Sequence, residues 1–405
     1  MSPVGSVVVV GAAAAGMAAA EALRQTGFDG RLIVVGEEPH RPYDRPPLSK
    51  QVLAGQWEPE RILLRADDVL RRQHIDLILG VRAQRLDIGS RRLELADGAS
   101  LSYDRLVVAT GVTPRRLPSG HDLAGVHTLK TIDDALALRR EFAASPAVVV
   151  VGGGFLGTEL AATARGQGLG VTLVYPEAYP LELQFGSVLG PVAAGLHLDH
   201  GVRLRPGTTV SRLLGSDGRV TGVECADGEI LDADIVVVCI GSAPATGWLD
   251  GSGLDLTNGV VCDHFGRAAE SVYAAGDVAS WRDPDTGRAV RVEHRTSASE
   301  QGAAVARHLL GELAEPLRSV PFFWTDQHGA RIQVHGELPR GGELLVIEGS
   351  LEERRFVGLW CFAGRAVGVV GWNLPKAARL ARRHVVESTA LDSSALDPLA
   401  LTAGR

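Results

Sequence analysis

The stretch from Ser6 to Leu23 reads "SVVVVGAAAAGMAAAEAL", and it decides how the chain begins to fold. Its first half, Val7 to Val10, consists of four β-branched residues, the pattern of a buried parallel strand. Its second half is rich in alanine, which is a strong helix former. Gly11 lies at the turn between them, and Gly16 lies about one helical turn further on. The stretch therefore predicts a strand, a tight turn and a helix.

The same stretch is apolar enough to suggest a secretion signal or a membrane span, but its details argue against both. A secretion signal needs a basic segment first, and no Lys or Arg precedes Val7. A membrane helix needs about 20 unbroken apolar residues, whereas Gly11, Gly16 and Glu21 interrupt this one. We therefore expect no targeting sequence, no membrane association and a cytoplasmic location.

Length and composition narrow the class of protein. The chain has 405 residues, of which 45% are hydrophobic and 22% charged, with a formal net charge of −7. At roughly 150 residues per domain this predicts two or three packed domains. The acidic balance argues against broad nucleic-acid binding. Four cysteines form no C-x-x-C spacing, so neither a zinc ribbon nor a local redox disulfide is indicated, and a reducing compartment is expected.

A glycine turn between a strand and a helix is where the pyrophosphate of a dinucleotide binds. The usual fingerprint is G-x-G-x-x-G, and this chain has Gly11, Ala13 and Gly16, with alanine in the middle position. The next strand, "RLIVVGEE", contains Glu37, which can accept hydrogen bonds from ribose hydroxyls. A plain strand–turn–helix remains the alternative for this motif taken alone.

The pattern recurs in "AVVVVGGGFLG", which predicts a strand over 147–151 followed by a helix to about Gln167. This copy keeps all three glycines, Gly152, Gly154 and Gly157. Two such sites imply two bound dinucleotides, the alternative being two ordinary strand–helix–strand units with glycine turns.

The second copy lacks the usual acid at the end of its next strand. Tyr175 stands in that place, and Glu177 follows two residues later. A 2′-phosphate would favour an arginine or lysine here, but residues 171–185 contain neither. We therefore expect NADH to be preferred over NADPH.

The C-terminal part of the sequence has a different residue pattern. Short alternating strands with aromatic residues over about 321–375 predict an antiparallel domain. A helix is expected from near His294, and another from Pro375. The second of these helices would carry a basic stripe on one face, which is either a solvated surface or a docking patch for an acidic partner. The stripe consists of Lys376, Arg379 and Arg383.

Taken together and in this order, seven motifs resemble the FAD-dependent, NADH-oxidising ferredoxin reductases that feed bacterial oxygenases and P450s. They are "GAAAAG" with Glu37, "PYDRPPLSK", "LVVATG", "VVGGGFLGTELAA", "VYAAGDVA", "VEHRTSASEQG" and "PFFWTDQHGARIQ", and the resemblance covers about residues 5–385.

The resemblance implies an α/β fold of the glutathione-reductase type. Two Rossmann-like dinucleotide-binding domains would be followed by a C-terminal α+β domain that covers the flavin. The FAD domain would be split into 1–112 and 243–320 by an inserted NAD domain at 113–242. The C-terminal domain would span 321–390, with a loosely ordered tail at 391–405.

The resemblance also implies site residues. FAD would be held by Gly11, Ala13, Gly16, Glu37, Val81, Thr110, Gly111, Gly276 and Asp277, with Arg45, Lys50 and Trp324 along the flavin. NADH would be held by Gly152, Gly154, Gly157, Glu159 and Glu177. Lys50, Glu159 and Trp324 would be catalytic, with Glu159 near the nicotinamide and able to pair with Lys50. No metal site is expected.

The mechanism follows from these assignments. The Lys50 ammonium would stabilise the negative charge that hydride transfer places on the flavin. Without a C-x-x-C pair, electrons would leave the flavin directly and singly, which suits a ferredoxin-type iron–sulfur partner. An acidic partner would need a basic patch, either the stripe near the C-terminus or arginines near 291–307.

Two other functions stay open. One is an NADH oxidase or small-molecule reductase on the same scaffold. The other, of a different class, is an NADH-sensing signalling flavoprotein resembling apoptosis-inducing factor. One departure from the family has no assigned effect: Arg295 stands where many relatives carry an aromatic residue, which could alter either the flavin environment or partner docking.

Overall fold

The computed structural model describes residues 4–144, 147–311 and 315–387. These residues divide into two compact units, and the chain passes between them several times. The first unit comprises the described residues within Met1–Asp44, Pro59–Thr113 and Ser242–Ser319. The second comprises the described residues within Arg45–Glu58, Pro114–Gly241 and Val320–Arg405.

The first unit is built on a six-stranded sheet in the order β19-β20-β7-β1-β2-β3, parallel except at β19. The strands are β1 (Ser6–Val10), β2 (Arg31–Gly36), β3 (Asp76–Leu79), β7 (Arg105–Val108), β19 (Arg267–Ala269) and β20 (Val272–Ala274). β1, β2 and β7 are buried on both faces, which explains their continuous runs of Val, Leu and Ile.

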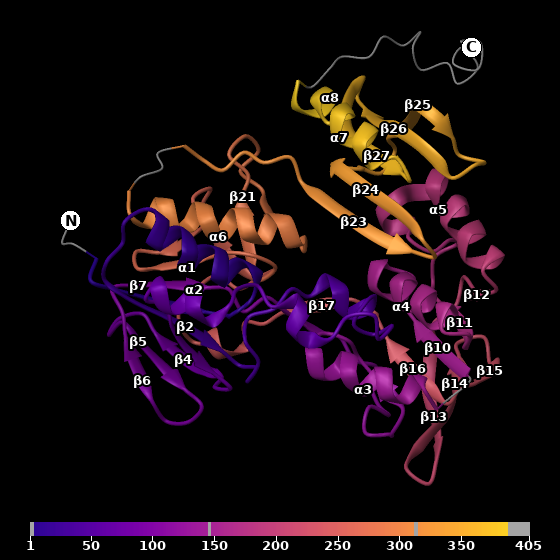
Figure 1. The fold of residues 1–405 in the computed structure, drawn as a ribbon, viewed down its shortest axis with the longest axis horizontal. Coiled ribbons are helices and arrows are strands. Elements are labelled where there is room, and N and C mark those ends of the chain that lie inside the picture. Colours follow the sequence, from indigo (N-terminus) through magenta and orange to yellow (C-terminus); the bar gives the residue numbers. More distant parts are fainter. Residues whose placement is uncertain (1–3, 145–146, 312–314, 388–405) are drawn as a thin grey trace. The chain divides into compact units, whose positions relative to one another are not determined.

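Two long helices of this unit, α1 (Ala14–Gln25) and α6 (Arg295–Leu309), pack closely against each other (Figure 1). Gly302 permits the approach, because a Cβ there would lie 2.2 Å from the Ala15 carbonyl oxygen. The remaining elements are α2 (Asp67–Arg72), the 3₁₀ turns η2 (Pro59–Ile62) and η3 (Gly247–Leu249), and the sheet strands β4 (Ala83–Asp87), β5 (Arg92–Leu95), β6 (Ser100–Ser102), β18 (Val260–Cys262), β21 (Ala279–Arg282) and β22 (Ala289–Arg291). Two short strands, β8 (Val112–Pro114) and β17 (Ser242–Pro244), pair with each other.

The second unit contains a five-stranded parallel sheet in the order β12-β11-β10-β16-β9. Its strands are β9 (Val126–His127), β10 (Ala147–Val151), β11 (Gly170–Val174), β12 (Arg203–Arg205) and β16 (Ile235–Val238). The helices are α3 (Ile132–Phe142), α4 (Phe155–Gly166) and α5 (Glu182–Asp199), the last kinked at Gly186. An antiparallel sheet adds β13 (Val210–Ser216), β14 (Arg219–Cys225) and β15 (Ile230–Asp232).

The same unit ends in an antiparallel sheet in the order β23-β24-β27-β26-β25, as the sequence predicts for 321–375 (Figure 1). Its strands are β23 (Phe322–Gln327), β24 (Ala330–Gly336), β25 (Glu343–Ser350), β26 (Arg355–Phe362) and β27 (Arg365–Trp372), followed by α7 (Pro375–Ala381) and α8 (Arg383–Val386). The side chains of Phe185 in α5, Phe356 and Trp372 share one hydrophobic core. This core joins the C-terminal sheet to α5.

The expected strand at 147–151 and the helix start at Pro375 are confirmed. The C-terminal helix is shorter than expected, because α7 ends at Ala381 and Arg383 opens the separate short helix α8. The domain boundaries expected from the sequence stay a prediction, and the tail at 391–405 lies outside the described residues. Among the described residues, no helix is long and apolar enough to cross a membrane.

Candidate functional site

The first glycine loop lies at the carboxyl end of β1, where only glycine fits. Gly11 has φ +119°, and a Cβ there would lie 2.1 Å from the Ala109 carbonyl oxygen. A Cβ on Gly16 would lie 1.8 Å from the Gly11 carbonyl oxygen, so this glycine lets α1 pack tightly onto the turn. These are the turn and packing roles of the outer glycines in a dinucleotide fingerprint.

The middle position of the fingerprint tolerates a methyl group. Ala13 is the N-cap of α1 and has extended backbone. In the second loop the equivalent residue is Gly154, where an added Cβ would meet nothing nearer than the Gln184 side chain at 3.9 Å. Both N-caps lack a side-chain cap, so the first N–H groups of α1 and α4 can bind an anion.

The other proposed FAD residues of the first unit lie at the same carboxyl edge of its sheet. Glu37 follows β2 with its side chain 71% exposed, and the backbone N–H of Val81 donates to the Gly36 carbonyl. Thr110 and Gly111 follow β7, and Gly276 and Asp277 follow β20 shortly after its last residue. Because these strands are parallel, their ends meet at one edge, and the residues fit a dinucleotide laid across it.

The second glycine loop, between β10 and α4, repeats the first. Gly152 has φ +117°, and a Cβ on it would lie 2.2 Å from the Cys239 carbonyl oxygen. A Cβ on Gly157 would lie 1.9 Å from the Gly152 carbonyl oxygen. The complete fingerprint therefore has the backbone geometry that its glycines require, and the loop fits a second dinucleotide.

Tyr175 does not replace the missing acid. Its side chain is 1% exposed, and a Cβ on Gly153 would lie 2.8 Å from its ring. Burial raises the pKa of Tyr175 to about 12, so the phenol stays neutral. Glu177, half-buried two residues further on, is the nearest acid along the chain. Arg205 on the neighbouring strand β12 already pairs with Asp227 and Glu229.

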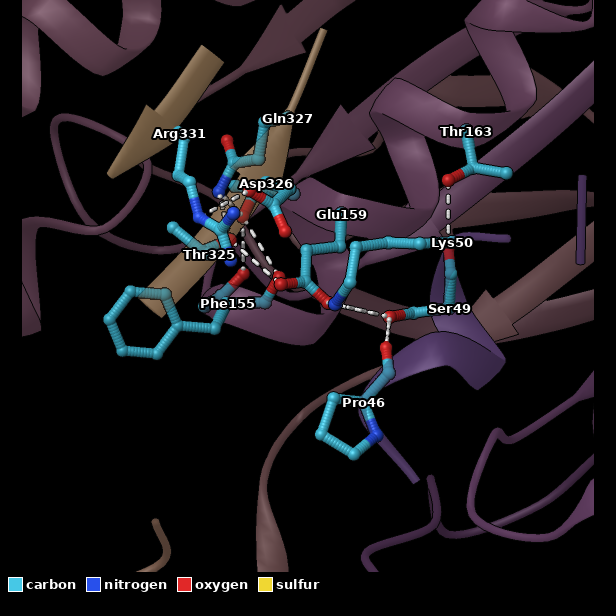
Figure 2. Close-up of polar contacts among 12 residues, drawn as sticks. Pro46, Ser49, Lys50, Phe155, Glu159, Thr163, Thr325, Asp326, Gln327 and Arg331 are labelled. Carbon is cyan, nitrogen blue, oxygen red and sulfur yellow. Dashed lines mark hydrogen bonds and ion pairs between the residues drawn. The ribbon is translucent and has the colours of Figure 1, made fainter. Parts of the chain in front are cut away.

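A buried ion pair lies beside the second loop (Figure 2). The Lys50 ammonium is 2.8 Å from Oε2 of Glu159, and the two side chains are only 11% and 9% exposed. Ser49 Oγ donates to the same carboxylate oxygen at 2.5 Å, and Thr325 Oγ1 donates to Oε1 at 2.8 Å. Three segments distant in sequence therefore meet at one carboxylate, which comes from α4, two residues after Gly157.

The segment that carries Lys50 is held rigidly. The short 3₁₀ turn η1 (Pro46–Ser49) begins with two prolines, which fix the backbone before Lys50. Thr163 Oγ1 of α4 donates to the Ser49 carbonyl at 2.7 Å, as Figure 2 shows, and Gln167 donates to the Leu53 carbonyl at 3.2 Å. The segment from Pro46 to Leu53 therefore anchors the lysine to the helix that carries Glu159.

Of the other residues expected along the flavin, Arg45 donates to the Lys130 carbonyl, and Trp324 lies on β23 with its ring stacked on Phe322 at 5.8 Å between centroids. Arg45, Lys50, Glu159 and Trp324 thus belong to the second unit, whereas the residues of the first glycine loop belong to the first. The structure describes each group within its own unit, and the roles of all these residues stay predictions.

Sequence reasoning missed two features. Arg295, whose effect it left open, pairs with Asp44 and donates to Ser299 Oγ at 2.6 Å, which ties Asp44 to α6 within the first unit. The partners are 251 residues apart, so no local pattern indicates them. It also missed Thr325 and Gln327, although the period of two along β23 places both on one face.

The cysteine thiols are unreactive, and the described residues offer no site for a metal ion. All four cysteines are free, and burial raises the pKa of each thiol. Protonated thiols are poor nucleophiles and poor redox partners. The described part of the chain contains no cluster of three or more His, Cys, Asp or Glu side chains that could hold a metal ion.

Two parallel sheets, each with a glycine loop that fits a dinucleotide, define the class of dinucleotide-dependent oxidoreductases. Comparison with known families agrees. Residues 5–302 match the model of the pyridine nucleotide-disulphide oxidoreductases, and residues 322–400 match a reductase C-terminal domain. The chain belongs to the pyridine nucleotide-disulphide oxidoreductase family.

Individual proteins are similar over nearly their whole length. Rhodocoxin reductase of Rhodococcus erythropolis is 37% identical over 381 residues, 93% of this chain and 88% of the relative. The ferredoxin–NAD(+) reductase subunit of the benzene 1,2-dioxygenase system of Pseudomonas putida is 36% identical over 382 residues, 94% and 92%. The crystal structure of a covalent putidaredoxin reductase–putidaredoxin complex matches with a TM-score of 0.90 and 32% identity, covering 98% and 99%.

The pKa values of four buried or half-buried histidines predict how the stability of the protein depends on pH. Burial lowers the pKa of His197, His294 and His335 to about 4 and that of His328 to about 3, from an ordinary value of 6.5. Between about pH 4 and 6.5 the unfolded chain therefore binds more protons than the folded one, and the free energy of unfolding must fall as the pH is lowered through this range.

The fully buried His197 alone accounts for a slope of up to about 1.4 kcal/mol per pH unit. Urea unfolding at several pH values measures the slope, and the His197→Gln variant should show a smaller one. An identical slope in wild type and variant would show that His197 is not held neutral.

Proposed function

We propose that this protein is an NADH-dependent ferredoxin reductase. It takes hydride from NADH onto FAD and passes single electrons to a ferredoxin-type iron–sulfur protein that serves a dioxygenase or a P450. When bound, FAD supplies the chemistry that accepts a hydride and releases electrons one at a time. The family, the relatives named above and the likeness to a reductase–iron–sulfur-protein complex support this function.

The observation that carries the proposal is the buried Lys50–Glu159 pair directly after a complete glycine loop. A cation in a dry site beside a dinucleotide stabilises negative charge far more than it would in water. Glu159 holds the ammonium of Lys50 in place, and Ser49 and Thr325 hold Glu159. These residues thus orient one fixed positive charge for hydride chemistry.

We also propose the cofactor assignments. FAD is held by Gly11, Ala13, Gly16, Glu37, Val81, Thr110, Gly111, Gly276 and Asp277, in a domain made of 1–112 and 243–320. NADH is held by Gly152, Gly154, Gly157, Glu159 and Glu177 in the domain at 113–242. Trp324, in the domain at 321–390, contacts the flavin ring. Open glycine loops and uncapped helix N-termini support both nucleotide sites.

The preference for NADH over NADPH rests on charge. Tyr175 is neutral, and the guanidinium of Arg205 is already engaged by two carboxylates, so neither residue is suited to bind a 2′-phosphate. Glu177 would repel that phosphate.

The proposed route of the electrons out of the flavin rests on the protonation state of the cysteine thiols. Burial raises the pKa of all four cysteines, so no thiolate is at hand to relay electron pairs. This favours direct one-electron transfer to an iron–sulfur partner over disulfide chemistry. Four free cysteines also suit a reducing compartment, which supports a cytoplasmic location.

The basic stripe on α7 and α8 is the favoured docking surface. Lys376, Arg379 and Arg383 are exposed, and none of them forms an ion pair with another described residue. By contrast Arg291 is 14% exposed and pairs with Glu293, and Arg295 pairs with Asp44. Unpaired exposed cations suit an acidic iron–sulfur protein because they steer its approach.

The first experiment replaces Lys50 by Met and follows anaerobic flavin reduction by NADH in a stopped-flow instrument. Loss of the buried cation removes charge stabilisation, so we expect the limiting rate constant to fall by about 10²-fold or more. Lys376→Met is the matched control, because it removes one of the other lysines without touching this site. An unchanged rate in Lys50→Met would contradict the role of the ion pair.

A second experiment reverses the stripe in the triple variant Lys376→Glu, Arg379→Glu and Arg383→Glu. We expect the KM for the iron–sulfur protein to rise about tenfold at low salt and the difference to shrink at high salt, because exposed charges are screened. NADH-driven dye reduction should not change. Reversal of Arg31, Arg71 and Arg140, all at least partly exposed and on other elements, is the control. Equal effects of the two triple variants would exclude the stripe as the docking site.

Steady-state turnover separates the alternatives. Strong stimulation of NADH oxidation by an iron–sulfur protein supports the reductase. Turnover linked only to oxygen would indicate the oxidase, and negligible turnover the signalling flavoprotein.

A further inference from the structure

Polar contacts continue from Glu159 into the interior of the second unit, beyond the ion pair (Figure 2). The side-chain amide Nε2 of Gln327 donates to Thr325 Oγ1 at 3.0 Å and to Thr158 Oγ1 at 2.9 Å. Its Oε1 lies 3.0 Å from Nε2 of His197, and Nδ1 of His197 lies 3.1 Å from Nε2 of His328. Thr325, Gln327 and His197 are 0–1% exposed.

The Glu159 carboxylate fixes which group donates in each hydrogen bond of the series Thr325, Gln327, His197 and His328. The single hydroxyl proton of Thr325 is donated to Glu159, so Thr325 can only accept from Gln327. The amide of Gln327 must therefore present its NH₂ group to Thr325 and its oxygen to His197. The reverse amide orientation would draw the Thr325 proton away from the carboxylate and leave a buried charge without its donor.

The histidines then have defined tautomers. Burial lowers the pKa of His197 to about 4 and that of His328 to about 3, so both rings are neutral near pH 7, with one donor and one acceptor each. His197 must carry its proton on Nε2 to donate to Gln327, which makes its Nδ1 an acceptor. His328 must then carry its proton on Nε2 as well.

Two further side chains, His200 and Arg165, lie near His328 at the outer end of this hydrogen-bonded series. His200 stacks on His328 with 4.2 Å between ring centroids and donates from Nδ1 to the Leu196 carbonyl. Arg165 donates from Nε to the His200 carbonyl at 3.0 Å. Burial first, and then the neighbouring His197, His200 and Arg165, lower the pKa of His328 and keep the outer end of the chain neutral.

We propose that Thr325, Gln327 and His197 are positioning residues for the Lys50–Glu159 pair. The hydrogen bonds from His197 to Gln327, from Gln327 to Thr325 and from Thr325 to Glu159 all point toward the carboxylate and hold it in the orientation that keeps the Lys50 ammonium in place. This inference rests on the proposed function for its effect on the reaction, but the polarity of the chain follows from the contacts alone. The residues act through Glu159 and touch no reactant.

If Thr325, Gln327 and His197 served only to satisfy buried hydrogen bonds, a change at one of them would not alter the tautomers of distant histidines. Buried polar groups need hydrogen-bond partners in any case. A set of hydrogen bonds whose donors and acceptors could exchange would satisfy them equally well. A directional chain couples its two ends. Without the Thr325 hydroxyl, the amide of Gln327 keeps only Thr158 Oγ1 as a partner on this side. The Thr158 hydroxyl can accept from the amide NH₂ or donate to the amide oxygen, so both amide orientations become available. The tautomers of His197 and His328 would then change, although neither histidine touches Thr325 in the described contacts.

The experiment uses the flavin-loaded protein with ¹⁵N-labelled histidine, without NADH. We expect the imidazole spectra of wild type near pH 7.5 to show His197 and His328 as Nε2–H tautomers. In Thr325→Val, which keeps the shape and removes the hydroxyl, both should shift to a mixture of tautomers. Thr325→Ser, which restores the hydroxyl, should restore the wild-type spectrum. Unchanged imidazole signals in Thr325→Val would overturn the proposal.

The same variants give a kinetic readout with NADH. Thr325→Val should lower the limiting rate of flavin reduction about tenfold, with the KM for NADH within about twofold of wild type, and Thr325→Ser should recover the rate. Gln327→Glu, of equal size, supplies a second acceptor for the Thr325 proton and should reduce the rate at least as much. A rise in KM alone, or no rescue by serine, would overturn the positioning role.

The two readouts separate the proposals. If the wild-type protein fails to reduce an iron–sulfur partner, the proposed function fails, while the imidazole spectra still report the polarity of the chain.

Discussion

The second unit depends on one buried carboxylate. Glu159 lies on α4 directly after the glycine loop, and it binds Lys50, Ser49 and Thr325 from two other parts of the chain. Burying two charges is costly unless the geometry is close and the remaining lone pairs have donors. Here both carboxylate oxygens are satisfied. Removing one partner would leave an uncompensated buried charge, which typically costs about 3–5 kcal/mol.

A second constraint is the shape of the two glycine loops. In each, the first glycine has φ near +118°, and its carbonyl oxygen lies where a Cβ of the last glycine of the fingerprint would stand. Side chains at these positions would collide with backbone, which cannot move without breaking the sheet. The loops therefore bring the N-termini of α1 and α4 close to the ends of β1 and β10. A fold built on this turn presents uncapped N–H groups, and these suit the phosphates of a dinucleotide.

Much of the architecture could be predicted from local pattern. Runs of valine identified β1 and β10, the glycine spacing identified the loops, and alternation identified the C-terminal antiparallel sheet. The break after Ala381 was not foreseen, because nothing in "PKAARLARRHV" interrupts a helix.

The polar contacts of the site were harder to predict. The pairing of Lys50 with Glu159 came from family resemblance, since 109 residues separate the two. Nothing in the sequence pointed to Ser49, Gln327 or His197, because periodicity shows which face a residue occupies but not which distant side chain it meets. The Asp44–Arg295 pair was missed for the same reason.

A double-mutant cycle on the rate of flavin reduction by NADH tests the central claim most directly. It compares Lys50→Met, Glu159→Gln and the double variant with the wild type. If the two residues act as one unit, the double variant will be little slower than the slower single variant, and the coupling will reach about 1–3 kcal/mol. Rate losses that simply multiply in the double variant would mean that the residues act independently, which would contradict the central role of the ion pair.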